Sequence, residues 1–127
     1  MRKKVLLVDD SATILMMERM ILSKLPYDCV TATNGAEAIA KAAAERPDLI
    51  LMDVIMPQMN GFDAVRRLRE QEATRETPII MVTTRGEAEN IESAYAVGCN
   101  DYVTKPINSA ELMAKMRNYL QSDQVRP

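Results

Sequence analysis

The segment Val5-Leu6-Leu7-Val8-Asp9-Asp10 carries four apolar residues into two acids and is the first of three similar runs. Residues 49–52 and 79–82 are also apolar at every position, and Asp53 directly follows the earlier of these two. Strands that are apolar on both faces are typical of a parallel sheet covered by helices on each side. These three runs therefore predict buried strands of one parallel sheet.

Strand and helix patterns alternate along the whole chain. Two weaker strand candidates lie at residues 28–33 and 101–104, and helical patterns cover about residues 11–25, 34–46, 61–71, 87–97 and 108–121. Five strand-helix pairs predict an α/β fold with a doubly wound, five-stranded parallel sheet and helices on both faces. We assign residues 1–122 to this one domain and residues 123–127 to a short tail after the last helix.

Capping residues mark the expected helix starts. Ser11, Asn34 and Asn108 precede three of the helices, and the spacing of Asn34 and Glu37 is that of a capping box. The expected inward stripe of the first helix, which Pro26 would end, is Ile14, Met17, Ile21 and Leu25. We interpret several methionines as core or partner-facing residues rather than metal ligands: Met16, Met17, Met20, Met113 and Met116.

The charge balance and the lack of histidine exclude several classes of function. The 127 residues include 16 basic and 18 acidic side chains, whereas a general nucleic-acid binder has lysine and arginine in excess. Without histidine, the chain has no Ser-His-Asp or Cys-His catalysis and no histidine-ligated metal. It also cannot carry a phosphohistidine of its own.

Cysteine usage and hydropathy favour a reduced, cytoplasmic protein without membrane association. Cys29 and Cys99 are too few for a disulfide framework or a closed zinc site. No apolar run approaches the ~18 residues that cross a bilayer. The basic amino terminus does not continue into a signal peptide, because Asp9 interrupts the apolar run that follows it.

Polar residues follow four of the predicted strands. The first strand ends in Asp9-Asp10, the third in Asp53, the fourth in Thr83-Thr84 and the fifth in Lys105-Pro106. Ligands of open parallel sheets bind beyond the carboxyl ends of the strands. Three carboxylates, a hydroxyl and an ammonium group are therefore expected to converge at one edge of the sheet.

The residue types in this set indicate phosphoryl chemistry. Clustered carboxylates need a nearby cation, and oxygen ligands alone suit Mg²⁺, with Mn²⁺ as a substitute. A carboxylate can also accept a phosphoryl group covalently. Each element alone has a simpler interpretation: Asp9-Asp10 as helix caps, Asp53 as a turn residue, Thr83-Thr84 as strand formers and Lys105 as a loop residue. Their placement at matching strand ends favours a common site.

These motifs resemble the receiver domain of two-component response regulators over nearly the whole chain. The matching segments are residues 5–10, residues 53–57 with Asn60-Gly61, residues 81–83 and residues 102–106. The resemblance implies a flavodoxin-like (βα)5 fold with strand order 2-1-3-4-5, in which the switch point lies between the first and third strands. It also implies a signalling module, similar to single-domain chemotaxis regulators, that is not an enzyme beyond its own phosphorylation and dephosphorylation.

The resemblance implies a role for each site residue. Asp53 would accept the phosphoryl group, and the Lys105 ammonium would pair with the phosphoryl oxygens. The Lys105-Pro106 peptide bond would be cis. The Mg²⁺ ligands would be Asp10, Asp53 and the main-chain carbonyl of Ile55, with Asp9 holding a metal-bound water. Thr83 would be the switch hydroxyl that binds the new phosphoryl group, and Tyr102 would turn inward, remodelling the face of the fourth helix, fifth strand and fifth helix.

Three further positions would modulate the lifetime of the phosphorylated state: Ile55, Thr84 and Arg85. The side chains of Ile55 and Arg85 flank the path of the hydrolytic water in this family. Ile55 cannot hydrogen-bond a water, so we expect a phosphorylated Asp53 that is not especially short-lived.

The implied partners are a sensor histidine kinase or phosphotransfer protein as donor and an unknown output protein, with the chain a monomer or a phosphorylation-dependent dimer. No direct contact with nucleic acid is expected. Three alternatives remain open: a module cut from a larger regulator, a receiver-like scaffold that takes no phosphate, and a haloacid-dehalogenase-like phosphatase. The last needs a second acid two residues after its nucleophile, where this sequence has Ile55.

Overall fold

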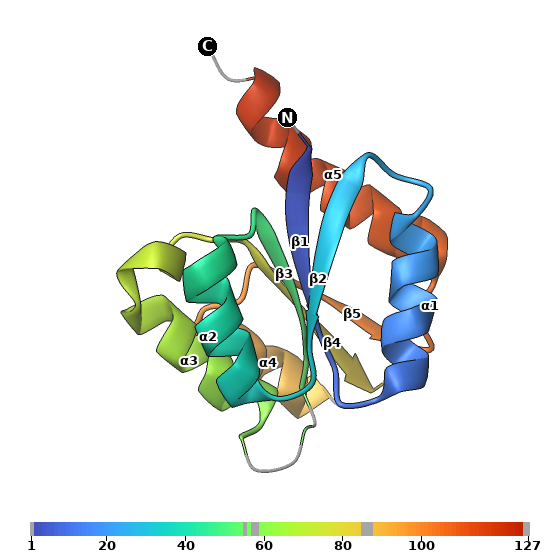
Figure 1. Ribbon diagram of the computed structural model, residues 1–127. Helices are drawn as coiled ribbons and strands as arrows, with labels where there is room; N and C mark the ends of the chain where they lie inside the picture. Colours follow the sequence, from blue (N-terminus) through green and yellow to red (C-terminus); the bar gives the residue numbers. More distant parts are fainter. Residues whose placement is uncertain (1, 55, 57–58, 85–87, 126–127) are drawn as a thin grey trace.

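One parallel sheet organises the chain, with helices on both of its faces (Figure 1). The computed structural model describes residues 2–54, 56, 59–84 and 88–125. The strands are β1 (Lys3–Val8), β2 (Tyr27–Ala32), β3 (Leu49–Asp53), β4 (Ile79–Thr84) and β5 (Asp101–Lys105). The helices are α1 (Ala12–Leu22), α2 (Gly35–Glu45), α3 (Gly61–Glu70), α4 (Ala88–Val97) and α5 (Ser109–Val125), with a 3₁₀ turn η1 (Glu72–Thr74).

The strand order is β2-β1-β3-β4-β5, and every pairing is parallel. This confirms the predicted doubly wound, flavodoxin-like sheet with order 2-1-3-4-5. The chain order reverses between β1 and β3, which lie side by side with Val8 opposite Met52. Crevices at such reversals are the usual ligand sites of open α/β sheets, because the flanking connections leave in opposite directions.

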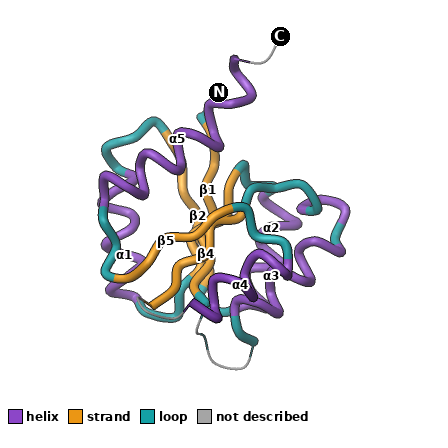
Figure 2. Tube along the Cα trace, turned by 180° about the vertical axis from the view of Figure 1, so that it is seen from behind, coloured by secondary structure: helices purple, strands orange, loops and turns teal. Residues whose placement is uncertain are grey.

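The alternation of side chains along the strands divides the core into two layers. Val5 and Leu7 pack with residues of α1 and α5, whereas Leu6 and Val8 pack with residues of α2, α3 and α4. Figures 1 and 2 show the same division, with α1 and α5 on one side of the sheet and the other three helices on the opposite side. The period of two in a strand produces this arrangement and determines which helix each strand-end side chain will meet.

Side-chain caps begin four of the helices. The Ser11 hydroxyl accepts the N–H of Ile14 in α1, and side-chain amide oxygens act in the same way before α2, α3 and α5, as Asn34, Asn60 and Asn108. The predicted capping box of α2 differs in its second half. Glu37 accepts the backbone N–H of Thr33 at 2.7 Å and the Thr33 hydroxyl at 2.9 Å rather than the N–H of Asn34.

The predicted inward stripe of α1 was partly wrong, because Ile21 and Leu25 are buried but Met17 is 39% exposed. The buried residues of this helix are Leu15, Glu18, Ile21 and Leu22, while Met16 and Met20 are each 64% exposed. This helix has apolar residues on all sides, so the period of its apolar positions did not single out one face. It also ends at Leu22, before the expected end at Pro26. The N–H groups of Lys24 and Leu25 bind carbonyls three residues back rather than four, which closes the helix in a tighter turn.

Two other helix ends bear on the predictions. The α4 helix is followed by Gly98 at φ +112°, a backbone conformation that favours glycine after a helix. The α5 helix runs to Val125, beyond its predicted end near residue 121. No glycine or proline interrupts residues 121–125, so no residue there stops the helix.

Gly61 begins α3 at a close approach to β3. A Cβ at this position would collide with the carbonyl oxygen of Asp53 and come within 2.9 Å of the Cα of Val54. The Gly61 N–H also donates to the Val54 carbonyl at 2.7 Å. The start of α3 is therefore held directly against the backbone that carries Asp53.

Candidate functional site

Three carboxylates meet where β1 and β3 end. Asp9 and Asp10 follow β1, and Asp53 is the last residue of the neighbouring β3. One oxygen from each lies within 4.8 Å of the others. Asp9 and Asp53 are buried, at 1% and 3% exposure, whereas Asp10 is exposed. The predicted convergence of these acids is confirmed, and the cluster opens to solvent through Asp10.

Lys105 places an ammonium group between the two buried acids. Its Nζ lies 3.1 Å from Asp53 Oδ1 and 3.5 Å from Asp9 Oδ2. β4 separates β5 from β3 in the sheet, so this long side chain crosses the end of a strand to reach them. The Lys105-Pro106 peptide bond is cis, as expected. Asp9 is also held by its Oδ1, which accepts the N–H of Ser11 at 2.9 Å.

Burial and mutual repulsion shape the charges of this cluster. Burial, followed by the charge of Asp9, raises the pKa of Asp53 to about 6, although Lys105 opposes the shift. Burial also raises the pKa of Asp9, against the Ser11 hydrogen bond and Lys105. Burial alone would lower the pKa of Lys105, but the hydrogen bond and charge of Asp53, with Asp9, outweigh it and raise that pKa. At neutral pH the Asp53 carboxylate is mostly ionised and Lys105 is protonated.

The acids and Lys105 lie on one face of the sheet, and Thr83 lies on the other. Successive side chains along a strand point to opposite faces of the sheet. Counted from the core residues that precede them, the side chains of Asp9, Asp53 and Lys105 belong to the face covered by α1 and α5. Val82 belongs to that same face, so the next side chain, Thr83, follows the face of α2, α3 and α4. Its hydroxyl is buried and has no hydrogen-bond partner among the described residues.

Tyr102 lies on the same face of the sheet as Thr83, on the neighbouring strand β5. Met81 pairs with Tyr102 and Thr83 with Thr104, so the two predicted switch residues belong to adjacent strands. The Tyr102 ring meets Tyr95 of α4 edge to face, with 6.1 Å between centroids, and the Nζ of Lys115 lies 5.0 Å from its centre. Tyr102 therefore links β5 to both α4 and α5.

The remaining predicted positions are less informative. Thr84 pairs with Lys105 in the backbone register of β4 and β5. Ile55 and Arg85 lie outside the described residues.

The chemistry of the donors fits a divalent ion such as Mg²⁺. The three residues offer oxygen ligands only, two from buried acids and one from an exposed acid. Asp9 Oδ2 is buried and accepts no hydrogen bond from the described residues, and the Lys105 ammonium is its ion-pair partner at 3.5 Å, so it can still accept a bond from a metal-bound water. Mg²⁺ prefers few carboxylates and retained waters, which this half-open cluster provides.

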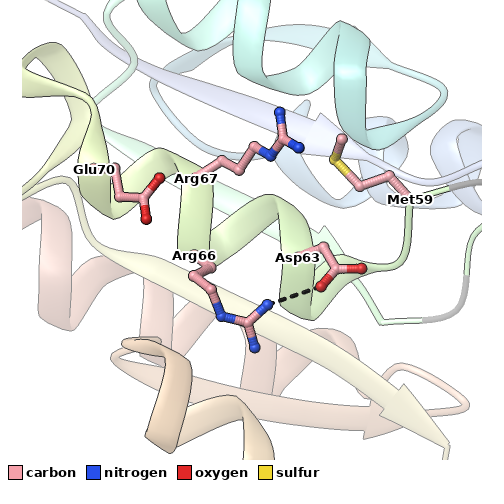
Figure 3. A pocket seen from close by; sticks show the side chains of 5 residues that line it. All are labelled: Met59, Asp63, Arg66, Arg67 and Glu70. Carbon is pink, nitrogen blue, oxygen red and sulfur yellow. Dashed lines mark hydrogen bonds and ion pairs between the residues drawn. The ribbon is translucent and has the colours of Figure 1, made fainter.

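A separate hollow of about 400 Å³ lies beside α3, lined by Met59, Asp63, Arg66, Arg67 and Glu70 (Figure 3). The Arg66 guanidinium is paired with Asp63 at 2.8 Å, and the charged side chains of this hollow are solvent-exposed or half-exposed. It contains no buried acid and no member of the carboxylate cluster. The candidate chemistry therefore belongs to the edge of the sheet.

Comparison with known families agrees with this geometry. The model of the response regulator receiver domain matches residues 5–117, almost the whole sheet and its helices. The chain belongs to the response regulator receiver domain family. This confirms the resemblance and the predicted class of function: the protein is a receiver domain of two-component, phosphorylation-based signalling.

Individual relatives resemble this receiver throughout its length. The phosphate regulon transcriptional regulatory protein PhoB of Pseudomonas aeruginosa is 40% identical over 119 residues, covering 94% of this chain and 52% of that protein. The Vibrio cholerae chemotaxis protein CheY4 has a TM-score of 0.88 at 39% identity, covering 94% of this chain and all of that one. The receiver domain of sensor histidine kinase PA1611 from P. aeruginosa PAO1 has a TM-score of 0.88 at 32% identity, covering 96% of this chain and 100% of that one. That structure holds a magnesium ion in its active-site cleft.

The receiver spans about half the length of the first curated relatives it matches, between 48% and 52% of each. Within the described part of the chain, none of the helices is both long and apolar enough to cross a membrane.

The sequence did not reveal one ionisable group close to the receiver site. Glu18 of α1 is 1% exposed, and its Oε1 has no partner among the described residues. The signal was present in its spacing, since Leu15 and Leu22 lie one turn to either side of it on the same face. A charged residue at an apolar-stripe position led the prediction to favour Met17 instead.

Proposed function

We propose that Asp53 is the phosphoacceptor and takes its phosphoryl group from a phosphohistidine on another protein. One observation carries the proposal: the Asp53 carboxylate lies 3.1 Å from Lys105 and within a 4.8 Å cluster that includes Asp9 and Asp10. A nucleophile, a cation for phosphoryl oxygens and ligands for a divalent ion thus share one small space. These 127 residues contain no histidine, so the donor histidine would lie outside them, on a sensor kinase or phosphotransfer protein.

The reaction needs no general base on this chain. An ionised oxygen of Asp53 forms the new bond to phosphorus while the bond from phosphorus to the donor imidazole nitrogen breaks. The electron pair of that bond stays with the ring, which takes up one proton to leave as neutral imidazole. Asp53, with a pKa of about 6, is already mostly ionised at neutral pH. Lys105 would follow the phosphoryl oxygens and offset their charge.

The proposed metal ligands are Asp10, Asp53 and the main-chain carbonyl of Ile55, with Asp9 acting through a water. Mg²⁺ is the expected ion and Mn²⁺ a substitute. When bound, the ion would supply positive charge that offsets the negative charge of the transferring phosphoryl group. Asp9 Oδ2 accepts no hydrogen bond from the described residues, which supports this assignment.

Thr83 and Tyr102 are the proposed switch. The Thr83 hydroxyl is buried and has no hydrogen-bond partner among the described residues, so it could donate to a phosphoryl oxygen on Asp53. Such a movement would open space on the face where Tyr102 packs against Tyr95. The altered face of α4, β5 and α5 would then be read by an output element, either a separate protein or an effector segment of the same protein.

The proposal also covers the lifetime of the phosphorylated state and the place where phosphoryl exchange occurs. Ile55, Thr84 and Arg85 would modulate the release of phosphate, since two of them flank the water path in the family. The exchange with the donor would take place in the cytoplasm, with the receiver a monomer or a phosphorylation-dependent dimer.

Intact mass spectrometry after incubation with acetyl phosphate and Mg²⁺ tests the phosphoacceptor directly. We expect a single phosphoryl adduct on the wild type, none on Asp53→Asn, and none when a chelator removes the ion. Asp63→Asn is the matched control, because it removes an exposed α3 carboxylate outside the cluster and should leave the adduct intact.

An adduct on Asp53→Asn would move the phosphoacceptor to another residue. A wild type that neither forms an adduct nor binds beryllofluoride would instead support the phosphate-independent scaffold.

A further inference from the structure

Glu18 is a buried acid without an assigned role. It lies on the inward face of α1 between Leu15 and Leu22, at 1% exposure. No hydrogen bond or ion pair joins it to any described residue, and its Oε1 is inaccessible to solvent. An unpaired buried carboxyl destabilises a fold, since an apolar side chain of similar size would pack there at less cost. Packing alone therefore gives no reason for an acid at this position.

The charged groups that act on Glu18 are those of the receiver site. They are Asp9 at the end of β1, Asp53 at the end of β3 and Lys105 at the end of β5. Side-chain alternation brings these three to the face of the sheet that α1 covers. The other packed elements add apolar and aromatic side chains to this layer, among them Tyr27, Leu112 and Met116, and the charge of Arg117 in α5 acts on Tyr27 rather than on Glu18. Glu18 therefore has the receiver site as its electrostatic surroundings.

We propose that Glu18 is a positioning residue of the receiver site, a buried carboxyl that sets Mg²⁺ affinity through its charge coupling to Asp9, Asp53 and Lys105 without touching the ion. The inference rests on the proposed function, because it requires that the acids bind Mg²⁺. The effect would pass through the electric field of the cluster.

The coupling has a defined direction. Burial, then the charges of Asp9 and Asp53, raises the pKa of Glu18 to about 8, so the group is mostly protonated at neutral pH. A cation added to the cluster favours the ionised form and lowers that pKa. Binding is then accompanied by the loss of the Glu18 proton to solvent, and affinity rises with pH until Glu18 is ionised in the free protein. Asp53, with a pKa of about 6, is already ionised over most of that range.

Calorimetric titration with Mg²⁺ tests this coupling on the intact chain. The wild type, Glu18→Gln and Glu76→Gln would be titrated at about pH 7 and about pH 8.5, in two buffers of different ionisation enthalpy, to count released protons. Glu76→Gln is the matched control, since it removes an exposed carboxylate just before β4, at the opposite edge of the sheet. Because some Gln variants fail to fold, Glu18→Leu serves as a second neutral variant.

We expect the Mg²⁺ affinity of the wild type and Glu76→Gln to rise about fourfold over this interval, which corresponds to a fall of about one unit in the pKa of Glu18 on binding. Both should release about half a proton per bound ion at the lower pH. Glu18→Gln and Glu18→Leu should show little change in affinity and release fewer protons. A neutral variant that keeps the wild-type pH dependence and proton release overturns this inference alone. A wild type that binds no Mg²⁺ overturns the proposed function as well.

Discussion

At the scale of single residues, the site holds charge in a place where the fold disfavours it. Asp9 and Asp53 are almost fully buried, and among the described residues Lys105 alone forms an ion pair with both of them. A cluster of this kind is destabilising until a cation arrives, because burial and like charges oppose ionisation together. Affinity for a divalent ion and low stability without it therefore have the same origin.

Neutralising Asp53 should stabilise the ion-free protein. We expect Asp53→Asn to increase the free energy of unfolding by about 1–2 kcal/mol near pH 7.5, since it removes a buried charge whose pKa is raised. Lost pairing with Lys105 limits the gain. Urea unfolding with a chelator present measures the difference, and saturating Mg²⁺ should reduce or reverse it. An equal or lower stability of the ion-free variant would contradict this account.

At the scale of elements, the position of Asp53 depends on how closely α3 approaches β3. Gly61 and Gly35 both begin helices directly after an asparagine cap, yet their surroundings differ. At Gly61 a Cβ would meet backbone atoms of Asp53 and Val54, whereas at Gly35 it would meet only the side chain of Met59. Backbone cannot move aside without moving the site, but a methionine can adopt another rotamer.

This pair of glycines gives a matched comparison. Gly61→Ala should lower the free energy of unfolding by about 2–3 kcal/mol, because the methyl group forces α3 and β3 apart. Gly35→Ala should change it by less than about 1 kcal/mol. Urea unfolding of both variants, followed by the phosphorylation assay on each, measures the effect. Similar losses for the two substitutions would show that the approach of α3 to β3 is not the controlling contact.

The sequence predicted correctly those elements whose residues have one clear hydropathy pattern. The runs at residues 5–8, 49–52 and 79–82 are apolar at every position and lie within β1, β3 and β4. The acids that follow two of these runs could be placed together because parallel strands end at a common edge. The inward face of α1 could not be derived, since its apolar residues surround the helix. A sequence pattern also does not show how far a long side chain extends. Lys105 of β5 extends past the end of β4 to pair with Asp53.

At the scale of the whole molecule, the buried acids make stability depend on pH. Burial is the first cause of the raised pKa values of Glu18, about 8, and Asp53, about 6. The folded protein therefore keeps protons that the unfolded chain has already released. The stabilisation from these protonated groups is fully present below their unfolded pKa values and is lost as pH rises through the folded ones.

The ion-free receiver should consequently lose about 2–4 kcal/mol of stability between about pH 5 and about pH 8. Mg²⁺ should flatten the upper part of this curve, since it favours the ionised acids. Urea unfolding across this range, with a chelator and then with Mg²⁺, measures both effects. Stability that is constant or rising over the range without Mg²⁺ would contradict the burial of these charges.

The central place of β1 in the sheet has a consequence for motion. Its backbone is bonded to strands on both sides, while β5 has a neighbour on one side only. Amide protons of Val5 to Leu7 should therefore exchange only through global unfolding, and those along the margin at β5 through smaller, more frequent openings. Asp9 is tethered to the slowest-exchanging strand, and Tyr102 and Lys105 to one of the fastest. Local opening of β5 can thus displace Tyr102 and Lys105 while Asp9 and Asp53 stay in place, since β3, the strand of Asp53, is also paired on both sides.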